Sequence, residues 1–229
     1  MKQHLNFQIS MGTIAAIAVL AGASFLFHHF PQVDISTAHA LYLGKGQFLL
    51  SNNALSHIID GPVDLFLKFG FLIAAVVYLL LCIIKFKIPP ELHQKLFFLF
   101  ITIACAELLI INFILKNHWG RARPVQLAEF NGPLHAHFTP AWDKVHECLS
   151  NCSFTSGHAG MAACTALLAV FFPPQWRGPY LVVSLAFVAL AGFIRMAHGA
   201  HFLSDVTLSP LIVLATAMVV KDAMRLKLN

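Results

Sequence analysis

The stretch LFLKFGFLIAAVVYLLLCII, residues 65–84, decides the class of fold. Only one of its side chains, Lys68, is charged, and a helix of about twenty such residues is long enough to cross the hydrocarbon core of a bilayer. Residues 9–27 and 96–115 form two further runs of similar length and hydrophobicity. Because the runs are continuous rather than alternating, and because a helix satisfies its own backbone in lipid, they predict membrane-spanning helices.

The composition supports the same class of protein. Hydrophobic residues make up 58% of the 229 residues and charged residues 11%, whereas about 25% charged residues is usual in a soluble domain. This composition excludes a disordered chain, an ordinary soluble enzyme and a protein whose main activity is nucleic-acid binding. Three shorter runs reach spanning length through small residues, at 159–172, 180–194 and 206–220. We therefore expect an all-α bundle of six transmembrane helices, in a single domain over residues 1–229.

Basic residues in the connecting segments predict the orientation in the membrane. One side holds Lys2, Lys85, Lys87, Lys95, Arg177, Lys221, Arg225 and Lys227. Because loops rich in lysine and arginine stay on the cytoplasmic side, we expect both termini in the cytoplasm. The first apolar run followed by Ala38-His-Ala40 also imitates a cleaved secretory signal, but the run is longer than a signal core, so we expect it to remain as the first helix.

Three clusters of polar residues stand at helix ends on the opposite, outer side. They are KNHWGRARP at 116–124, SFTSGH at 153–158 and RMAHGAHFLSD at 195–205. A single lysine or arginine at such a place often only reaches towards the lipid head groups. With this orientation we expect Lys116, Arg123 and Arg195 to converge on one face of the membrane. The only acid in the three clusters is Asp205, so the cations predict an anionic ligand.

Phosphate fits this set of cations best. Guanidinium groups bind phosphate oxygens in pairs, and lysine acts as a point charge. The backbone amides of Ser156 and Gly157 lie where the fourth helix is expected to begin, and a helix N-terminus binds anions. The sequence therefore predicts a phosphate site formed by Lys116, Arg123, Arg195, Ser156 and Gly157.

Two histidines in the clusters have separable roles. His201 and Asp205 are four residues apart, so on a helix the carboxylate can orient one ring nitrogen and raise the basicity of the other. That arrangement suits a nucleophile. His158 has no such partner in its own cluster and could donate a proton to a leaving oxygen. We expect no metal and no cofactor, because the sequence lacks the clustered carboxylates that would hold Mg²⁺.

The three clusters resemble the signature of the type 2 phosphatidic acid phosphatase superfamily, in its membrane branch. That signature reads Lys, six residues, Arg-Pro; then Pro-Ser-Gly-His; then Ser-Arg, five residues, His, three residues, Asp, and this sequence keeps every internal spacing. Thr155 replaces the proline and Ile194 replaces the serine. The resemblance implies a six-helix core with an outward-facing site, and a phosphohistidine on His201 oriented by Asp205. It further implies that His158 protonates the leaving group and then activates water.

The flanking residues resemble a narrower group, the bacterial lipid A phosphatases of the 4′-phosphatase type. The resemblance is carried by HWGRARPV at 118–125, EFNG at 129–132, NCSF at 151–154 and HFLSDV at 201–206. It implies lipid A as the substrate, in the inner membrane of a Gram-negative bacterium, with the active site facing the periplasm. It also implies that His118, Arg121 and His198 contact the head group. Apart from the lipid substrate and the bilayer, the sequence indicates no nucleic acid and no protein partner.

Other lipids and reactions fit the same residues. Phosphatases of phosphatidylglycerophosphate, phosphatidic acid and undecaprenyl pyrophosphate share the chemistry. A lipid phosphotransferase would resolve the phosphohistidine with another lipid instead of water. A non-catalytic lipid-binding or transport protein would need only the cations, and the pairing of His201 with Asp205 beside a separate His158 argues against it.

Two of the five cysteines lie in the second outer loop. In an oxidising compartment Cys148 and Cys152 would close a short disulfide loop. With His135, His137 and His146 in the same loop, the alternatives are a zinc site or two free thiols. The spacing matches no standard zinc site, so we expect the disulfide.

Overall fold

The computed structural model describes residues 9–226, except for the side chains of residues 55, 59 and 60. Lys2 and Lys227, which entered the predicted orientation, lie outside the described residues. In the described part of the chain, regular structure is almost entirely helical, as predicted. The strands there form one short antiparallel hairpin, β1 (Tyr42–Gly44) and β2 (Gln47–Phe48).

Within residues 9–226, five helical segments are long and apolar enough to cross a membrane. They are α1 (Met11–His29); α3 (Ala54–Ile58), η1 (Ile59–Val63) and α4 (Asp64–Ile83) in succession; α5 (Pro90–Ile103) and η2 (Ala104–Lys116) in succession; α7 (Pro174–Ala197); and α8 (Leu203–Ala223). The predicted fourth span corresponds to α6 (Gly157–Cys164) followed by the 3-10 helix η5 (Thr165–Phe171), an apolar segment shorter than the others. The chain is thus an all-α membrane protein, and the count of six spans stays a prediction.

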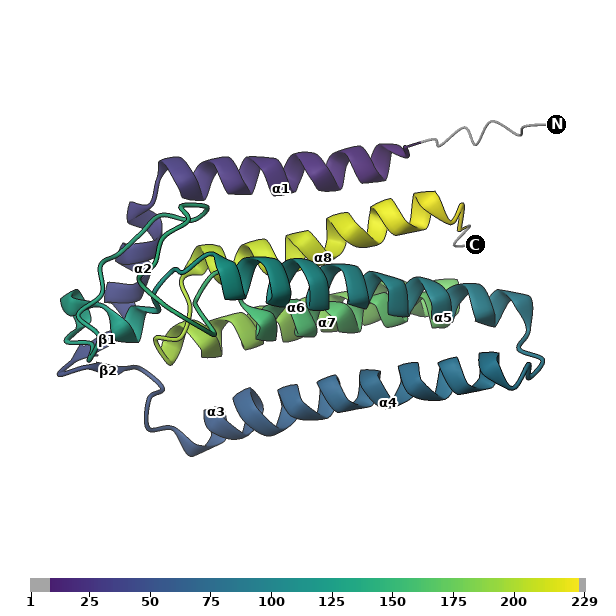
Figure 1. Ribbon diagram of the computed structural model, residues 1–229, viewed down its shortest axis with the longest axis horizontal. Helices are drawn as coiled ribbons and strands as arrows, with labels where there is room; N and C mark the ends of the chain where they lie inside the picture. The colour runs from purple at the N-terminus through teal and green to yellow at the C-terminus, as the bar shows by residue number, and fades with distance from the viewer. Residues whose placement is uncertain (1–8, 227–229) are drawn as a thin grey trace.

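The helix α8 lies at the centre of the bundle, in contact with α1, α5, α6 and α7 (Figure 1). Small residues make these contacts close. A Cβ atom at Gly192 of α7 would lie 3.3 Å from Cβ of Val206 on α8. At the other end of α8, Thr13 of α1 donates to Asp222 at 2.6 Å and ties the first helix to the last. By contrast, α4 lies at the rim of the bundle, and most of its side chains are exposed.

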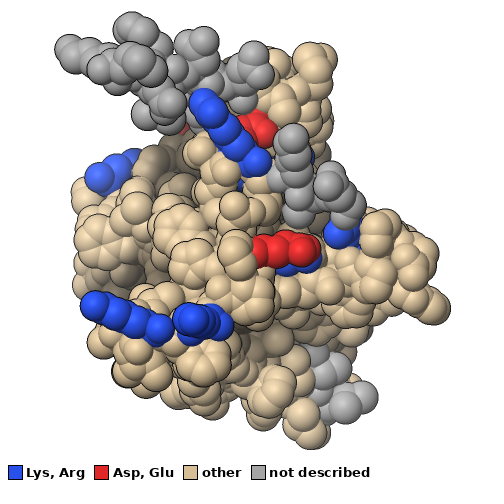
Figure 2. Space-filling view, turned by 90° about the vertical axis from the view of Figure 1, so that its right-hand side faces the viewer, with Lys and Arg blue, Asp and Glu red and all other residues tan. Residues whose placement is uncertain are grey.

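The two ends of the bundle differ in chemistry. At one end, α4 passes into α5, α7 begins and α8 ends (Figure 1). In and beside these segments lie the basic residues from which we predicted the cytoplasmic side: Lys85, Lys87, Lys95, Arg177, Lys221 and Arg225. Figure 2 views this end and shows Lys and Arg side chains around it. The two long loops and all three polar clusters lie at the opposite end.

The first outer segment folds onto the bundle. The helix α2 (Gln32–Leu41) packs on α7 and α8 and buries Asp34. Together with the hairpin and the 3-10 helices η3 (Pro124–Gln126) and η4 (Ala128–Phe130), it surrounds a small apolar core separate from the main one. The members of that core are Ala38, Phe48, Ala122, Leu127, Phe130, Ala136 and Phe202. The burial of Phe202 places the turn before α8 inside this core.

Close contacts between segments shape the outer end, and Gly120 and Gly199 stand at positions where such a contact requires glycine. Gly120 has φ +74°, and a Cβ atom there would overlap the carbonyl group of Val145. Gly199 has φ +66°, and a Cβ atom there would press into the ring of Phe48. Both glycines stand in the polar clusters, so their backbone conformation sets the path of the chain beside the candidate site.

Gly120→Ala should therefore destabilise the protein. The substitution combines an unfavourable φ with overlap on a backbone carbonyl, and we expect the free energy of unfolding to fall by more than about 1 kcal/mol. Gly22→Ala is the matched control, because Gly22 lies inside α1 with nothing within 4 Å of an added Cβ atom. Alanine there should stabilise the helix by about 0.5–1 kcal/mol. Unfolding in detergent measures both, and equal effects would contradict this account of Gly120.

Candidate active site

The fold brings the three polar clusters together. Lys116 ends η2, His158 lies in the first turn of α6, and Arg195 lies in the last turn of α7. The amide of Ser156 donates to the carbonyl of Asp205 at 3.2 Å, which joins the second cluster to the third. The first cluster meets the second at Gly157, where a Cβ atom would lie 3.6 Å from Nζ of Lys116. These segments are far apart in sequence and form one site.

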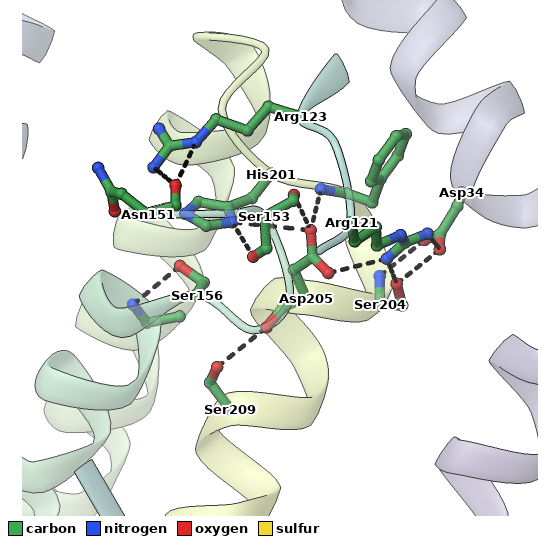
Figure 3. Close-up of polar contacts among 12 residues, drawn as sticks. Asp34, Arg121, Arg123, Asn151, Ser153, Ser156, His201, Ser204, Asp205 and Ser209 are labelled. Carbon is green, nitrogen blue, oxygen red and sulfur yellow. Dashed lines mark hydrogen bonds and ion pairs between the residues drawn. The ribbon is translucent and has the colours of Figure 1, made fainter. Parts of the chain in front are cut away.

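His201 is buried at the centre of this site, with 1% of its surface exposed (Figure 3). Its Nδ1 atom lies 2.8 Å from the carbonyl oxygen of Ser153, an acceptor only, so Nδ1 carries the proton and donates it. The proton-free Nε2 atom is buried and has no hydrogen-bond partner among the described residues. A ring held in this tautomer has its nucleophilic lone pair on Nε2.

Asp205 orients His201 differently from the expected arrangement. We expected both residues on one helical face, but His201 precedes α8, whose N-cap is Phe202. Asp205 is the third residue of α8, and its Oδ2 atom accepts from the amide of Phe202 at 2.9 Å and from Ser153 Oγ at 2.5 Å. The same oxygen lies 3.6 Å from Nδ1 of His201. The carboxylate of Asp205 therefore fixes Ser153 and Phe202, which flank the ring. The carbonyl of Ser153 accepts the hydrogen bond from Nδ1 of His201.

The pKa of His201 is lowered to about 3. Burial is the main cause; Arg195 and Lys116 lower the pKa further, and the adjacent Asp205 opposes them. The ring is consequently neutral at physiological pH, which is the state required for nucleophilic attack.

Arg121 does not face a head group, contrary to the expectation from sequence. It is fully buried, and its guanidinium lies between two carboxylates (Figure 3). Nη1 donates to Asp205 and Nη2 donates to Asp34, both at 2.8 Å. Nε donates to the carbonyl of Thr139 at 2.9 Å, and the ring of Phe202 lies 4.3 Å from Cζ. These contacts use the donors that would otherwise bind a ligand, so Arg121 is a structural residue.

Asp34 was not identified from the sequence. Its two oxygens accept from Arg121 and from the amide and hydroxyl of Ser204, at 2.7 and 2.5 Å for the two Ser204 donors. It stands in an apolar outer segment far from the three clusters, and nothing in the residues around it indicates that the segment folds over α8.

Arg123 and Arg195 bring positive charge to the site from two of the clusters. Arg123 donates from Nη2 and Nε to the carbonyl of Asn151, at 2.8 and 3.3 Å, in the loop before α6 (Figure 3). Arg195 is 8% exposed and close enough to His201 for its charge to act on the ring. With Lys116 and the N-terminal amides of α6, these cations can surround an anion beside Nε2 of His201.

Two charged residues within the apolar runs also lie at the site. Glu107 of η2 is fully buried, accepts from Asn112 at 2.9 Å, and lies where a Cβ atom at Gly160 would overlap it. Lys68 of α4 is close enough for its charge to act on Lys116 and His158. Ionisable residues inside spans usually mark function, and that signal could have identified both from the sequence.

The remaining predicted residues, His118 and His198, contact other parts of the chain. His118 is exposed, and its Nδ1 lies 2.7 Å from the carbonyl oxygen of Phe113. His198 lies 2.8 Å from Ser56 Oγ and stacks on His57 with ring centroids 4.7 Å apart. Contact of either histidine with a head group stays a prediction.

Cys148 and Cys152 are joined in a disulfide. Because both sulfur atoms are in this bond, neither cysteine offers a thiolate to a zinc ion. Among the described residues, no group of three or more His, Cys, Asp or Glu side chains could hold a metal ion.

Comparison with known proteins supplies independent information. The profile of the PAP2 superfamily matches residues 94–227, which include all three clusters. The Lipid A 4'-phosphatase of Francisella tularensis subsp. novicida (strain U112) is 32% identical over 231 positions, covering 94% of this chain and 95% of the relative. No solved structure matches the chain significantly.

Two further relatives match over shorter regions. The Lipid A 4'-phosphatase of Rhizobium leguminosarum is 37% identical over 142 residues, 61% of this chain and 60% of the relative. The Lipid A 4'-phosphatase of Rhizobium etli (strain ATCC 51251 / DSM 11541 / JCM 21823 / NBRC 15573 / CFN 42) is 40% identical over 124 residues, 53% of this chain and 48% of the relative. The match therefore spans less than two thirds of the length of either Rhizobium protein.

Asp34→Ala should destabilise the protein strongly. The change leaves the buried guanidinium of Arg121 with one carboxylate, and breaking a buried pair costs about 3–5 kcal/mol. Asp143→Ala is the control, since Asp143 forms a half-exposed pair with His28 at 3.5 Å and should contribute less than about 1 kcal/mol. Denaturant titration in detergent measures both. A loss of less than about 1 kcal/mol in the Asp34 variant would contradict a structural role for the pair.

Proposed function

Because the chain belongs to the PAP2 superfamily, we propose that it is a membrane lipid phosphatase that removes a phosphate monoester from lipid A. The observation that carries this proposal is the buried, neutral ring of His201, within reach of the charges of Lys116 and Arg195. The choice of lipid is supported by three relatives, each named Lipid A 4'-phosphatase. We expect the 4′-phosphate to be the group removed, and a single PAP2-type domain over residues 1–229.

In the first step His201 acts as the nucleophile. The lone pair on Nε2 attacks phosphorus and forms an N–P bond, while the P–O bond to the lipid breaks and its electron pair moves to oxygen. His158 transfers a proton to that oxygen, so the lipid leaves as an alcohol. Asp205 and the carbonyl of Ser153 stabilise the positive charge that develops on His201.

In the second step water releases the phosphate. His158, now neutral, takes a proton from water as the water oxygen attacks phosphorus, and the N–P bond breaks with its electrons returning to His201. Lys116, Arg123 and Arg195 neutralise the oxygens of the transferring group, and the amides at Ser156 and Gly157 add hydrogen bonds. Each step uses the protein's own side chains, so we expect EDTA to leave the rate unchanged.

An apolar cavity supports a lipid as the substrate. It has a volume of about 490 Å³ and lies between α4 on one side and α5 with η2 on the other. Phe71, Ala75 and Phe100 line it, and Lys68, Glu107 and Asn112 add polar side chains to its lining. Glu107 also lies beside Gly157, so the cavity adjoins the phosphate site. An acyl chain in this cavity would place its phosphate among the cations.

The proposed enzyme spans the bacterial inner membrane six times, with both termini in the cytoplasm and the site facing the periplasm. The basic end of the bundle supports this orientation through the preference of lysine and arginine for the cytoplasmic side. The disulfide at the other end supports it as well, because disulfides persist in the oxidising periplasm.

His201→Ala should abolish phosphate release, by at least about 1,000-fold, because no other group supplies the nucleophile. Phosphate release in detergent with EDTA measures the loss. His146→Ala is the control, since His146 is exposed in the outer loop and should not affect the rate. Turnover by the His201 variant at the wild-type rate would contradict the phosphohistidine mechanism.

The same assay tests the substrate. The panel consists of lipid A, phosphatidylglycerophosphate, phosphatidic acid and undecaprenyl pyrophosphate, and we expect turnover of lipid A. Mass spectrometry of the product then identifies the phosphate removed. Turnover of a glycerophospholipid alone would keep the mechanism and exclude lipid A as the substrate. Phosphate transferred to a second lipid, rather than released, would identify a phosphotransferase.

Filling the cavity should impair activity on lipid A and leave activity on a soluble substrate unchanged. Ala75→Trp places a large ring where we expect the acyl chain, so the KM for lipid A should rise at least about tenfold. Hydrolysis of p-nitrophenyl phosphate, which has no acyl chain, should be unaffected. Ala74→Trp is the control, because Ala74 is exposed on α4 and does not line the cavity. Equal losses on both substrates in the Ala75 variant would contradict this position for the chain.

A further inference from the structure

The helix α4 brings a charged pair to the site that belongs to none of the three polar clusters. Asp64 and Lys68 lie one turn apart on α4, and Nζ of Lys68 donates to Oδ2 of Asp64 at 2.6 Å. The same oxygen lies 3.5 Å from Nε2 of His158. One carboxylate oxygen thus lies between the lysine and the histidine to which the proposed mechanism assigns proton transfer.

The charges around His158 explain why a carboxylate is needed there. Among the described side chains, the charges of Lys68 on α4, Lys116 on η2 and Arg195 on α7 act on the ring, and so does His201 in the turn before α8. Lys68, Lys116 and Arg195 are basic, and their positive charge opposes a proton on His158. Asp64 supplies a negative charge at ion-pair distance from Nε2. It offsets these cations at the atom that must hold the proton.

The other oxygen of Asp64 also indicates function. Oδ1 is buried and has no hydrogen-bond partner among the described residues. A buried carboxylate oxygen left in this state is unfavourable, and such groups are found at functional sites. A cavity of about 20 Å³ adjoins Asp64, His158 and Ala162, which is enough space for one water molecule. A wider groove lined by Phe66 and Phe69 also reaches Asp64 and His158.

We propose that Asp64 is a positioning residue for His158, holding the imidazolium that protonates the leaving oxygen of the lipid, and that Lys68 fixes the Asp64 carboxylate. The inference rests on the proposed phosphatase function and adds a residue to its acid–base chemistry. The separation of 3.5 Å is that of an ion pair rather than a hydrogen bond, so the Nε2 proton stays available for transfer. After transfer the neutral ring accepts a proton from water, and Asp64 again stabilises the imidazolium that forms.

Two substrates whose leaving groups differ in their need for a proton distinguish a role in proton transfer from a merely structural role. p-Nitrophenolate leaves without a proton, whereas the alkoxide of lipid A requires one. Single-turnover rates isolate the first P–O cleavage for each substrate. In Asp64→Asn we expect the rate with lipid A to fall at least about tenfold, and the rate with p-nitrophenyl phosphate to fall less than about threefold. Equal losses on both substrates, or none on lipid A, would overturn the proposal.

Two further variants test the charge itself. Asp64→Glu keeps the carboxylate and should recover most of the rate with lipid A. Asp143→Asn is the matched control, because Asp143 also lies 3.5 Å from a histidine, His28, but in another part of the protein. This control should leave both rates unchanged. Failure of Asp64→Glu to exceed Asp64→Asn would overturn the proposal.

A measurement without turnover separates this proposal from the proposed function. The ¹⁵N resonances of His158, assigned with His158→Asn, report its protonation against pH in the presence of inorganic phosphate. In Asp64→Asn we expect the midpoint to move at least about one pH unit lower, because a ring without its counter-ion loses its proton more readily. An unchanged midpoint overturns the role of Asp64, whatever the activity. A wild-type protein inactive on both substrates overturns the phosphatase function, and the midpoint still decides the role of Asp64.

Discussion

The guanidinium of Arg121, held between Asp34 and Asp205, is the interaction on which the rest of the site depends. It joins α2, the loop after η2 and the first turn of α8, three segments that share no local sequence contact. Removing one partner would leave an uncompensated charge in a buried place, which is among the more costly changes a fold can suffer. Asp205 in turn fixes Ser153 and the amide of Phe202, and these groups set the position of the His201 ring. The position of His201, the proposed nucleophile, therefore depends on a buried charge network.

Basic residues of one cluster consequently have different roles. Arg121 and Arg123 are two residues apart, yet Arg121 is enclosed by carboxylates while Arg123 reaches the loop before α6. In a regular extended strand residues two apart point to the same face, so the two side chains diverge because this loop is irregular. One guanidinium then stabilises the outer loops, and the other adds to the positive potential around His201. Carboxylates neutralise the charge of Arg121, whereas the charge of Arg123 can act on an anionic ligand.

The packed centre of the bundle and its rim contribute different residues to the proposed site. The helices α6, α7 and α8 approach closely through small residues and hold His158, Arg195 and Asp205 in place. The rim helix α4 is largely exposed, adjoins the apolar cavity and carries Asp64 and Lys68 towards His158. A closely packed centre preserves the positions that phosphoryl transfer requires. In the proposed enzyme the rim contacts lipid, so contacts there can favour one lipid over another without displacing His201, the proposed nucleophile.

By itself the sequence determined the membrane class, the helical fold and the membership of the three clusters, because hydrophobic run length and local spacing are properties of neighbouring residues. It also paired Cys148 with Cys152 correctly. The tertiary structure alone decided that Arg121 is buried, that Asp34 is its partner and that Asp64 lies against His158. It placed His201 in the turn before α8, where the carbonyl of Ser153 orients the ring, although the spacing to Asp205 suggested a shared helical face. These contacts join residues many positions apart, and their geometry depends on how whole segments pack, which no local pattern encodes.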